Sequence, residues 1–283
     1  MTRATRPRGS VPWTWLWLLP GLAFMGALFV LPICRMAWDS VSDPVPGLGN
    51  YAAILSERLY LRVFWNSIWS ATGATLASVL IGYALAYAIC RASGRRRRLI
   101  LGLVMFSYVV GTVPRAFSWL VVLGDRGLAN LLLLRLGITR SRVPLIYNEF
   151  GVLVGMIHVM LPFVTLILLG SMLRVGAHLV PAARTLGATS RRAFWEVFVP
   201  LTRPGVLAAM MIVFVYSLGF YIVPAVLGGA GQTTIVMEIQ ELALNLGDWG
   251  LAAALSTAVV LVSILGAAMY VRTTGLADVH GHE

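Results

Sequence analysis

The 24 residues from Phe150 to Leu173 read FGVLVGMIHVMLPFVTLILLGSML and contain no Asp, Glu, Lys or Arg. A run of about 20 apolar residues is long enough for an α-helix to cross the hydrocarbon core of a bilayer. We therefore predict that this segment is a transmembrane helix.

Five further blocks of 21 to 25 residues have the same apolar character. The 283-residue chain is 59% hydrophobic and 12% charged, whereas soluble domains are about 45–50% apolar and about 25% charged. The sequence predicts an all-α, polytopic membrane protein with six transmembrane helices inside residues 13–271, flanked by tails at residues 1–12 and 272–283. A cleaved secretory signal is the alternative for the first block, but its 22 residues favour an uncleaved anchor. The five blocks are Trp13–Cys34, Asn66–Cys90, Leu99–Leu123, Gly205–Leu227 and Leu251–Val271.

The distribution of arginine predicts the orientation. All 22 basic residues are Arg, and 14 of them fall in segments on one side if the N-terminus is cytoplasmic. That side then carries the whole formal net charge of +11, as the positive-inside rule requires. We expect both termini to be cytoplasmic. Because topology in a lipid bilayer explains the basic charge, nucleic-acid binding is not expected.

Composition also excludes several chemistries. Without any Lys the chain has no P-loop lysine and no Schiff-base lysine. Two Cys and four His are too few for a cysteine-built zinc site or a disulfide framework, so no metal site is predicted. No loop is long enough to be a soluble domain. We expect a non-catalytic chain, whose transport energy comes from a partner or from an ion gradient.

An ion-coupled carrier would place its coupling group within the membrane. The six blocks contain no Asp or Glu, one histidine, His158, and Arg115 near the outer end of the third block. We interpret His158 as a neutral imidazole bonded to a neighbouring helix, with a proton relay as the alternative. Arg115 either extends to the outer interface or lies in a transport path. The missing carboxylates favour transport that is driven by a partner protein. An ion-coupled secondary carrier or channel and a non-transporting scaffold stay open as alternatives.

The segment from Arg174 to Pro204 is the longest one predicted to be inside. Pro181 suits the first turn of a helix, and Gly187 can stop that helix in a left-handed conformation. Ser190 is a plausible N-cap of a second short helix that would end before Pro200. Two short helices joined at a glycine would form a compact knob that fits a groove on a partner.

This segment resembles the cytoplasmic "EAA" loop in the permeases of bacterial ABC importers. Ala182-Ala183, Gly187 and Pro200 stand at the family's spacing, but Pro181 replaces its glutamate. The resemblance implies that the loop docks on an ATPase, and the missing carboxylate implies a larger share for Arg184, Arg191 or Arg192. The coupling residues so implied are Pro181, Ala182, Ala183, Arg184, Gly187 and Pro200.

Other motifs look like the spermidine/putrescine-type permeases of this family. They include Asn66-Ser67, Arg115-Ala-Phe117-Ser-Trp119 and the run from Phe220 to Gly229. The resemblance implies a bacterial inner-membrane complex. Its parts are a second, similar permease, a dimer of ATP-binding subunits that bind ATP and Mg, and a periplasmic substrate-binding protein. It implies no cofactor in this chain.

For a polyamine cargo we expect aromatic faces and outer carboxylates along the path. The alternative is that the aromatic residues form interfacial belts and the acids are solvated. An opine, an amino-acid derivative or another small polar solute is the alternative cargo, because no carboxylate lies at bilayer depth. Pro162 and Pro224 could mark bends, and Gly151 and Gly155 a close packing face. The candidate path residues are Tyr108, Arg115, Phe117, Trp119, Tyr216, Phe220, Tyr221, Glu238, Glu241 and Asp248.

Overall fold

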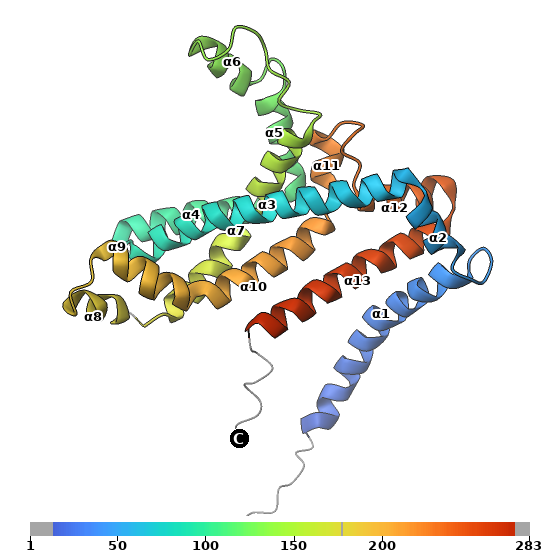
Figure 1. Cartoon of the computed structure of the whole chain (residues 1–283), viewed down its shortest axis with the longest axis horizontal. Helices are drawn as coiled ribbons and strands as arrows, with labels where there is room; N and C mark the ends of the chain where they lie inside the picture. Colours follow the sequence, from blue (N-terminus) through green and yellow to red (C-terminus); the bar gives the residue numbers. More distant parts are fainter. Residues whose placement is uncertain (1–13, 177, 275–283) are drawn as a thin grey trace, which may run out of the picture.

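The computed structural model describes residues 14–176 and 178–274, and these residues form helices joined by short loops, without a strand among them (Figure 1). Two of the helical segments, η1 and η2, are π-helical turns. In chain order the elements are α1 (Thr14–Ser42), α2 (Gly49–Ser56), α3 (Arg58–Arg91), α4 (Gly94–Val109), α5 (Thr112–Leu123), α6 (Leu128–Arg135), α7 (Glu149–Arg174), α8 (Leu179–Thr185), α9 (Ser190–Ala193), η1 (Phe194–Phe198), α10 (Val199–Leu218), α11 (Ile222–Leu227), α12 (Ile235–Gln240), η2 (Glu241–Leu246) and α13 (Trp249–Thr274).

Six helical stretches in the described part of the chain are long and apolar enough to cross a membrane. This confirms the predicted all-α class and the predicted number of spans. Four stretches cover most of the predicted blocks, and the third and fifth are displaced along the chain. The six are Trp17–Ser42, Arg58–Arg91, Thr112–Arg135, Glu149–Arg174, Ser190–Leu218 and Trp249–Arg272.

The prediction of one continuous helix from Leu99 to Leu123 was wrong. Helix α4 ends at Val109, and α5 begins at Thr112. Pro114 explains the break, because a proline ring clashes with the carbonyl four residues earlier in an α-helix, here that of Val110. In the structure Pro114 lies in the first turn of α5, where this clash does not arise.

The predicted helix from Gly205 to Leu227 is interrupted for the same reason. Helix α10 ends at Leu218, and the short α11 begins at Ile222 with Pro224 in its first turn. The predicted bend at Pro224 is therefore a full break between two helices. Pro162, by contrast, lies inside α7, whose assigned span continues from Glu149 to Arg174.

The main core lies where α3, α7 and α10 pack together, with α11 against the start of α7. Small residues allow this close approach. A Cβ built on Gly82 of α3 would lie 2.8 Å from Val164 Cγ1, and one built on Gly155 of α7 would lie 2.6 Å from Leu227 Cδ1. The predicted close packing at Gly155 is thus confirmed, and its partner helix is α11. A Cβ on Gly151 would instead lie closest to the loop before α7, 2.9 Å from the Leu145 carbonyl oxygen.

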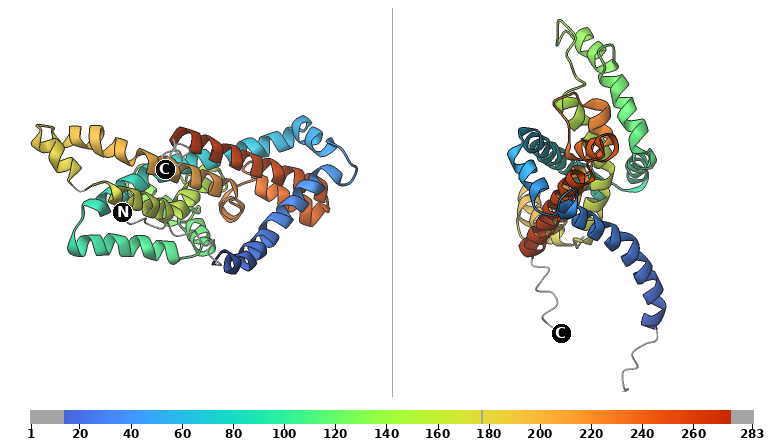
Figure 2. Two further views of the ribbon diagram at one scale, coloured as in Figure 1. Left: turned by 90° about the horizontal axis from the view of Figure 1, so that it is seen from below. Right: turned by 90° about the vertical axis from the view of Figure 1, so that its right-hand side faces the viewer.

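Helix α1 diverges from the rest of the bundle (Figure 2). It packs mainly along α13, and none of the residues in its most apolar part is buried. A second, smaller core joins the ends of α2, α3, α12 and α13, around Tyr60, Ile235 and Leu255. This second core forms the end of the molecule opposite α8 and α9 (Figure 1).

Candidate coupling site and transport path

The loop between α7 and α10 forms the predicted knob. Helix α8 carries Pro181 in its first turn, and Gly187 follows it with a φ of +94°. Such a φ favours glycine, which has no Cβ, and it turns the chain toward α9. These features confirm the predicted stop at Gly187 and the predicted place of Pro181.

Two details of the predicted knob were wrong. The N-cap of α9 is Thr189, whose Oγ1 accepts from Arg192 N at 3.2 Å, and not Ser190. The second helix also does not end before Pro200, because α9, η1 and α10 follow without a gap. The π-helical turn Phe194–Phe198 ends two residues before this proline, and its wider spacing accommodates a ring that a continuous α-helix would reject. The knob is therefore continuous with α10.

The outer surface of the knob is partly apolar. Pro181, Ala182, Gly187 and Pro200 are exposed and Ala183 is half-buried. Leu186 is 89% exposed at the tip between α8 and α9. Trp195 in η1 is 60% exposed and was likewise not singled out from the sequence. The exposure of Leu186 could have been predicted from the sequence. Leu186 stands next to Gly187, where the chain turns between two short helices, and a side chain at such a turn is far from the core.

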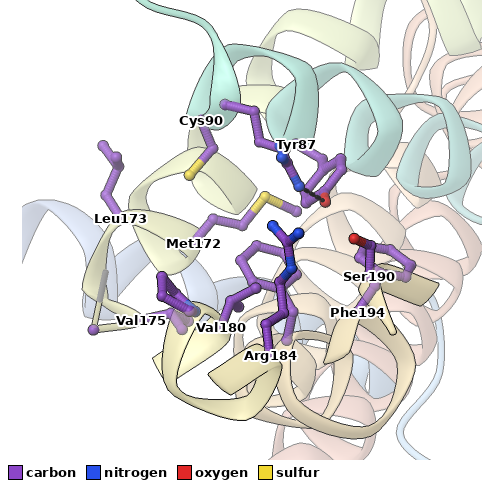
Figure 3. Close-up of a pocket in the computed structure, with 13 residues that line it drawn as sticks. Tyr87, Cys90, Met172, Leu173, Val175, Val180, Arg184, Ser190 and Phe194 are labelled. Atoms are coloured by element: carbon purple, nitrogen blue, oxygen red, sulfur yellow. Dashed lines mark hydrogen bonds between the residues drawn. The ribbon is translucent and has the colours of Figure 1, made fainter. Parts of the chain in front are cut away.

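The three arginines of the knob have different environments. Arg192 Nε donates to both carboxylate oxygens of Glu196 at 2.8 and 3.0 Å, so its charge is already paired. The Arg184 side chain runs from α8 into a cavity behind the knob (Figure 3). Arg191 is exposed, and no carboxylate pairs with it in the described part of the chain.

That cavity has a volume of about 370 Å³ and lies between the knob and the helix bundle. The bundle side is formed by the last turns of α3 and α7, and the knob side by α8, α9 and η1 (Figure 3). Its lining residues are Tyr87, Cys90, Arg91, Met172, Leu173, Val175, Gly176, Val180, Pro181, Arg184, Ser190, Phe194 and Phe198.

Several of the candidate path residues contact one another in two places, one between α5 and α7 and one around α10. Trp119 Nε1 donates to His158 Nδ1 at 2.9 Å, which joins α5 to α7. The predicted hydrogen bond from His158 to a neighbouring helix is confirmed, with Nδ1 as the acceptor. The second place is around Tyr216 of α10, whose ring centroid lies 6.2 Å from that of Phe163 and 5.6 Å from that of Phe220.

Arg115 is 8% exposed and lies beside these aromatic residues. Its Nη1 donates to the Val159 carbonyl at 3.3 Å and its Nε to the Gly111 carbonyl at 3.4 Å. No carboxylate pairs with it among the residues that the structure describes. Tyr108, Phe117 and Tyr221 are exposed instead, and the structure does not bring them into either contact.

The three acidic candidates lie at the end with the second core. Asp248 Oδ1 accepts from Leu251 N at 3.0 Å and so caps α13, and Glu241 accepts from Asn245 Nδ2. Glu238 in α12 is 9% exposed, and no side-chain hydrogen bond reaches it from the described residues. Burial raises the pKa of its carboxyl above the ordinary value, and the nearby Glu241 charge raises it further.

Comparison with known proteins shows which family the sequence of this chain matches. Residues 78–273, more than half of the chain, match the sequence profile of the family described as "Binding-protein-dependent transport system inner membrane component". The spermidine/putrescine transport system permease protein PotB of Escherichia coli (strain K12) is 30% identical over 262 residues, which cover 92% of this chain and 93% of that protein. A probable molybdenum ABC transporter permease protein of Haloferax volcanii is 30% identical over 267 residues, covering 94% and 92%.

A solved structure shares the fold. The bacterial alginate ABC transporter, in complex with its alginate pentasaccharide-bound periplasmic protein, contains a chain that superposes with a TM-score of 0.79 at 16% identity. The match covers 92% of this chain and 93% of that one. At this identity the likeness concerns the arrangement of helices alone.

Proposed function

Because the chain belongs to the family of binding-protein-dependent transport system inner membrane components, it is a permease subunit of an ABC importer, and we propose that its loop from Arg174 to Pro204 couples it to an ATP-hydrolysing partner. The chain is a multi-pass inner-membrane protein. Membership of this family favours the importer over the ion-coupled carrier. In this proposal both termini are cytoplasmic, and ATP and Mg bind to the partner.

The observation that carries the coupling role is the knob itself. It joins α7 directly to α10, and its tip exposes Leu186 next to a glycine in a left-handed conformation. An exposed aliphatic side chain on a compact projection suits a groove on a partner protein. The continuity of η1 with α10 means that a displacement of the knob is transmitted to the helix that carries Tyr216.

Movement of α7 and α10 would change both the Trp119–His158 contact and the Tyr216–Phe220 contact. We therefore place the transport path beside these side chains. Closure of an ATPase dimer would rock the two helices, so that the path alternates in access between the two membrane faces. A second, similar permease would complete the walls of the path, and a periplasmic binding protein would deliver the cargo.

The proposed cargo is a small polyamine-type cation. The similarity to PotB supports it, and so does Glu238, a buried carboxyl at the end opposite the knob whose side chain has no hydrogen bond within residues 14–176 and 178–274. One observation favours the alternative of an opine or amino-acid derivative. Arg115 is a buried guanidinium with no acid partner in the described residues, and a carboxylate on the cargo would match it. Uptake of labelled putrescine, competed with an opine, separates the two cargoes.

The coupling role is tested with Gly187→Arg. A residue with a Cβ is strained at a φ of +94°, and a long charged side chain would obstruct docking at the tip. Gly137→Arg is the matched control, because Gly137 also has a positive φ, +67°, and open space around it, on the α6 side of the molecule. We expect Gly187→Arg to insert but to lose co-purification with the ATPase subunits, and Gly137→Arg to keep it. Normal co-purification and uptake by Gly187→Arg would remove the docking role.

A further inference from the structure

The cavity of about 370 Å³ behind the knob has a different character from the outer docking face. Leu186, the exposed tip of the knob, does not line it, and its walls come from both the bundle and the knob. Cavities of roughly 300–1,000 Å³ are typical of small-molecule sites. The cavity therefore has room for a ligand that the docking role does not require.

Two guanidinium groups converge on one side of this cavity. Arg91 Nη1 donates to Tyr87 Oη at 2.9 Å, and its Cζ lies 5.6 Å from the Tyr87 ring centroid. Arg184 reaches from α8 toward the same tyrosine (Figure 3). Both ion pairs in the described part of the chain lie elsewhere, at Arg35–Asp39 and Arg192–Glu196. The two arginines are thus available for an anion, and the guanidinium fork matches phosphate oxygens.

The remainder of the cavity wall is mostly apolar. Cys90, Met172 and Val180 line it, together with the rings of Phe194 and Phe198. These residues include the last turns of α3 and α7, two of the membrane-spanning helices. A ligand that matches both the arginine side and the apolar side of the cavity has an anionic head and an apolar tail. Such a ligand would enter at the level of the lipid headgroups.

We propose that this cavity binds an anionic phospholipid, with the phosphate held by Arg91 and Arg184 and the start of an acyl chain against Met172 and Phe194. Arg91 belongs to α3, and Arg184 belongs to the knob. The bound lipid therefore ties the knob to the bundle and regulates how far the knob moves. The regulatory step depends on the proposed coupling function, whereas the binding step does not.

The natural cysteines allow a direct test of occupancy. The sequence has two cysteines, of which Cys34 is exposed on α1 and Cys90 lines the cavity. In a Cys34→Ser chain, a neutral maleimide reports access to Cys90. The full chain is placed in nanodiscs of phosphatidylcholine, alone or mixed with phosphatidylglycerol. We expect phosphatidylglycerol to slow the labelling of Cys90.

The arginines should account for this protection. Each basic residue near an anionic leaflet contributes about fivefold to binding, so Arg91→Gln combined with Arg184→Gln should remove most of the protection. Arg191→Gln, which changes the same charge in the same loop outside the cavity, should retain it. Equal labelling rates in the two lipids would overturn the proposal, and so would equal protection in the double variant.

A second arm identifies the source of the phosphate. Glycerol 3-phosphate added to phosphatidylcholine nanodiscs should leave Cys90 labelling unchanged, because it has no tail for the apolar wall. Protection by this soluble phosphate would overturn the assignment to a lipid. ATP hydrolysis by the assembled complex is measured on the same variants. If the double variant hydrolyses ATP at the wild-type rate, the regulatory step is overturned. Failure of the coupling role would be seen separately, in Gly187→Arg, and would leave the protection of Cys90 unchanged.

Discussion

The indole Nε1 of Trp119 donates to Nδ1 of His158 across 2.9 Å, and this bond ties α5 to α7 inside the proposed path. The two rings also meet edge to face, with centroids 5.7 Å apart. Nδ1 of His158 is therefore the hydrogen-bond acceptor in this contact.

Removal of this hydrogen bond should lower the stability of the folded chain, and uptake should remain driven by ATP. Trp119→Phe keeps an aromatic ring but leaves Nδ1 of His158 without its donor. Hydrogen bonds between membrane helices are worth about 0.6 kcal/mol on average and up to about 1.7, so a loss within this range is expected from unfolding of the purified chain. Uptake should still require ATP. If uptake by the wild type collapsed with a protonophore while ATP was maintained, His158 would act as a proton relay instead.

Gly155 predicts a packing defect in the same helix. A Cβ at this position would lie 2.6 Å from Leu227 Cδ1 and 2.7 Å from Val223 Cγ1, so Gly155→Ala forces α11 away from α7. Overpacking of this kind costs about 1–3 kcal/mol. Gly170→Ala is the matched control in α7, since nothing lies within 4 Å of the Cβ that would be added there. Equal thermal stability of the two variants would contradict the close approach of α11.

Glu238 predicts a pH-dependent stability. Because burial raises the pKa of its carboxyl in the folded chain, the folded state binds the proton more tightly than the unfolded state. Its contribution to the free energy of unfolding is complete below the ordinary pKa of 4.5 and is lost as the pH rises through the raised pKa. Glu238→Gln keeps the neutral shape at every pH.

The melting temperature of Glu238→Gln should therefore match that of the wild type near the ordinary pKa and exceed it increasingly as the pH rises to neutrality. Glu57→Gln, at an exposed acid of the same end of the molecule, is the control and should show a smaller difference. A difference that is constant with pH would show that Glu238 is not held in a desolvated site.

The sequence alone was sufficient for the number of spans and for the stop at Gly187 because both depend on local chemistry. Apolar length identified six spans, and Gly187 took the left-handed conformation that its place after a short helix suggested. The breaks before Pro114 and Pro224 were also encoded locally, by the clash of each ring with an earlier carbonyl. Apolar composition concealed them, since hydrophobicity continues across both breaks.

The candidate site depends more on tertiary contacts. Trp119 contacts His158 only because α5 packs on α7, and Tyr216 contacts Phe163 only because α10 packs on α7. No spacing within one helix predicts either contact. The direction of Arg184 has the same origin. From the sequence, Arg184 was predicted to be a docking residue. In the structure its side chain points into a cavity formed with α3 and α7. Which aromatic and acidic candidates contact the cargo stays a prediction.

The tip of the knob offers the most direct test of the coupling role. A photo-crosslinking residue placed at Leu186, which is 89% exposed, should form a covalent product with the ATP-binding subunit in membranes that contain the complete importer. Crosslinking from Leu136, 70% exposed beyond α6, serves as the comparison and should give no product with that subunit. An ATPase adduct from Leu186 alone is the predicted result. Adducts of Leu186 with periplasmic proteins, or with lipid only, would contradict it.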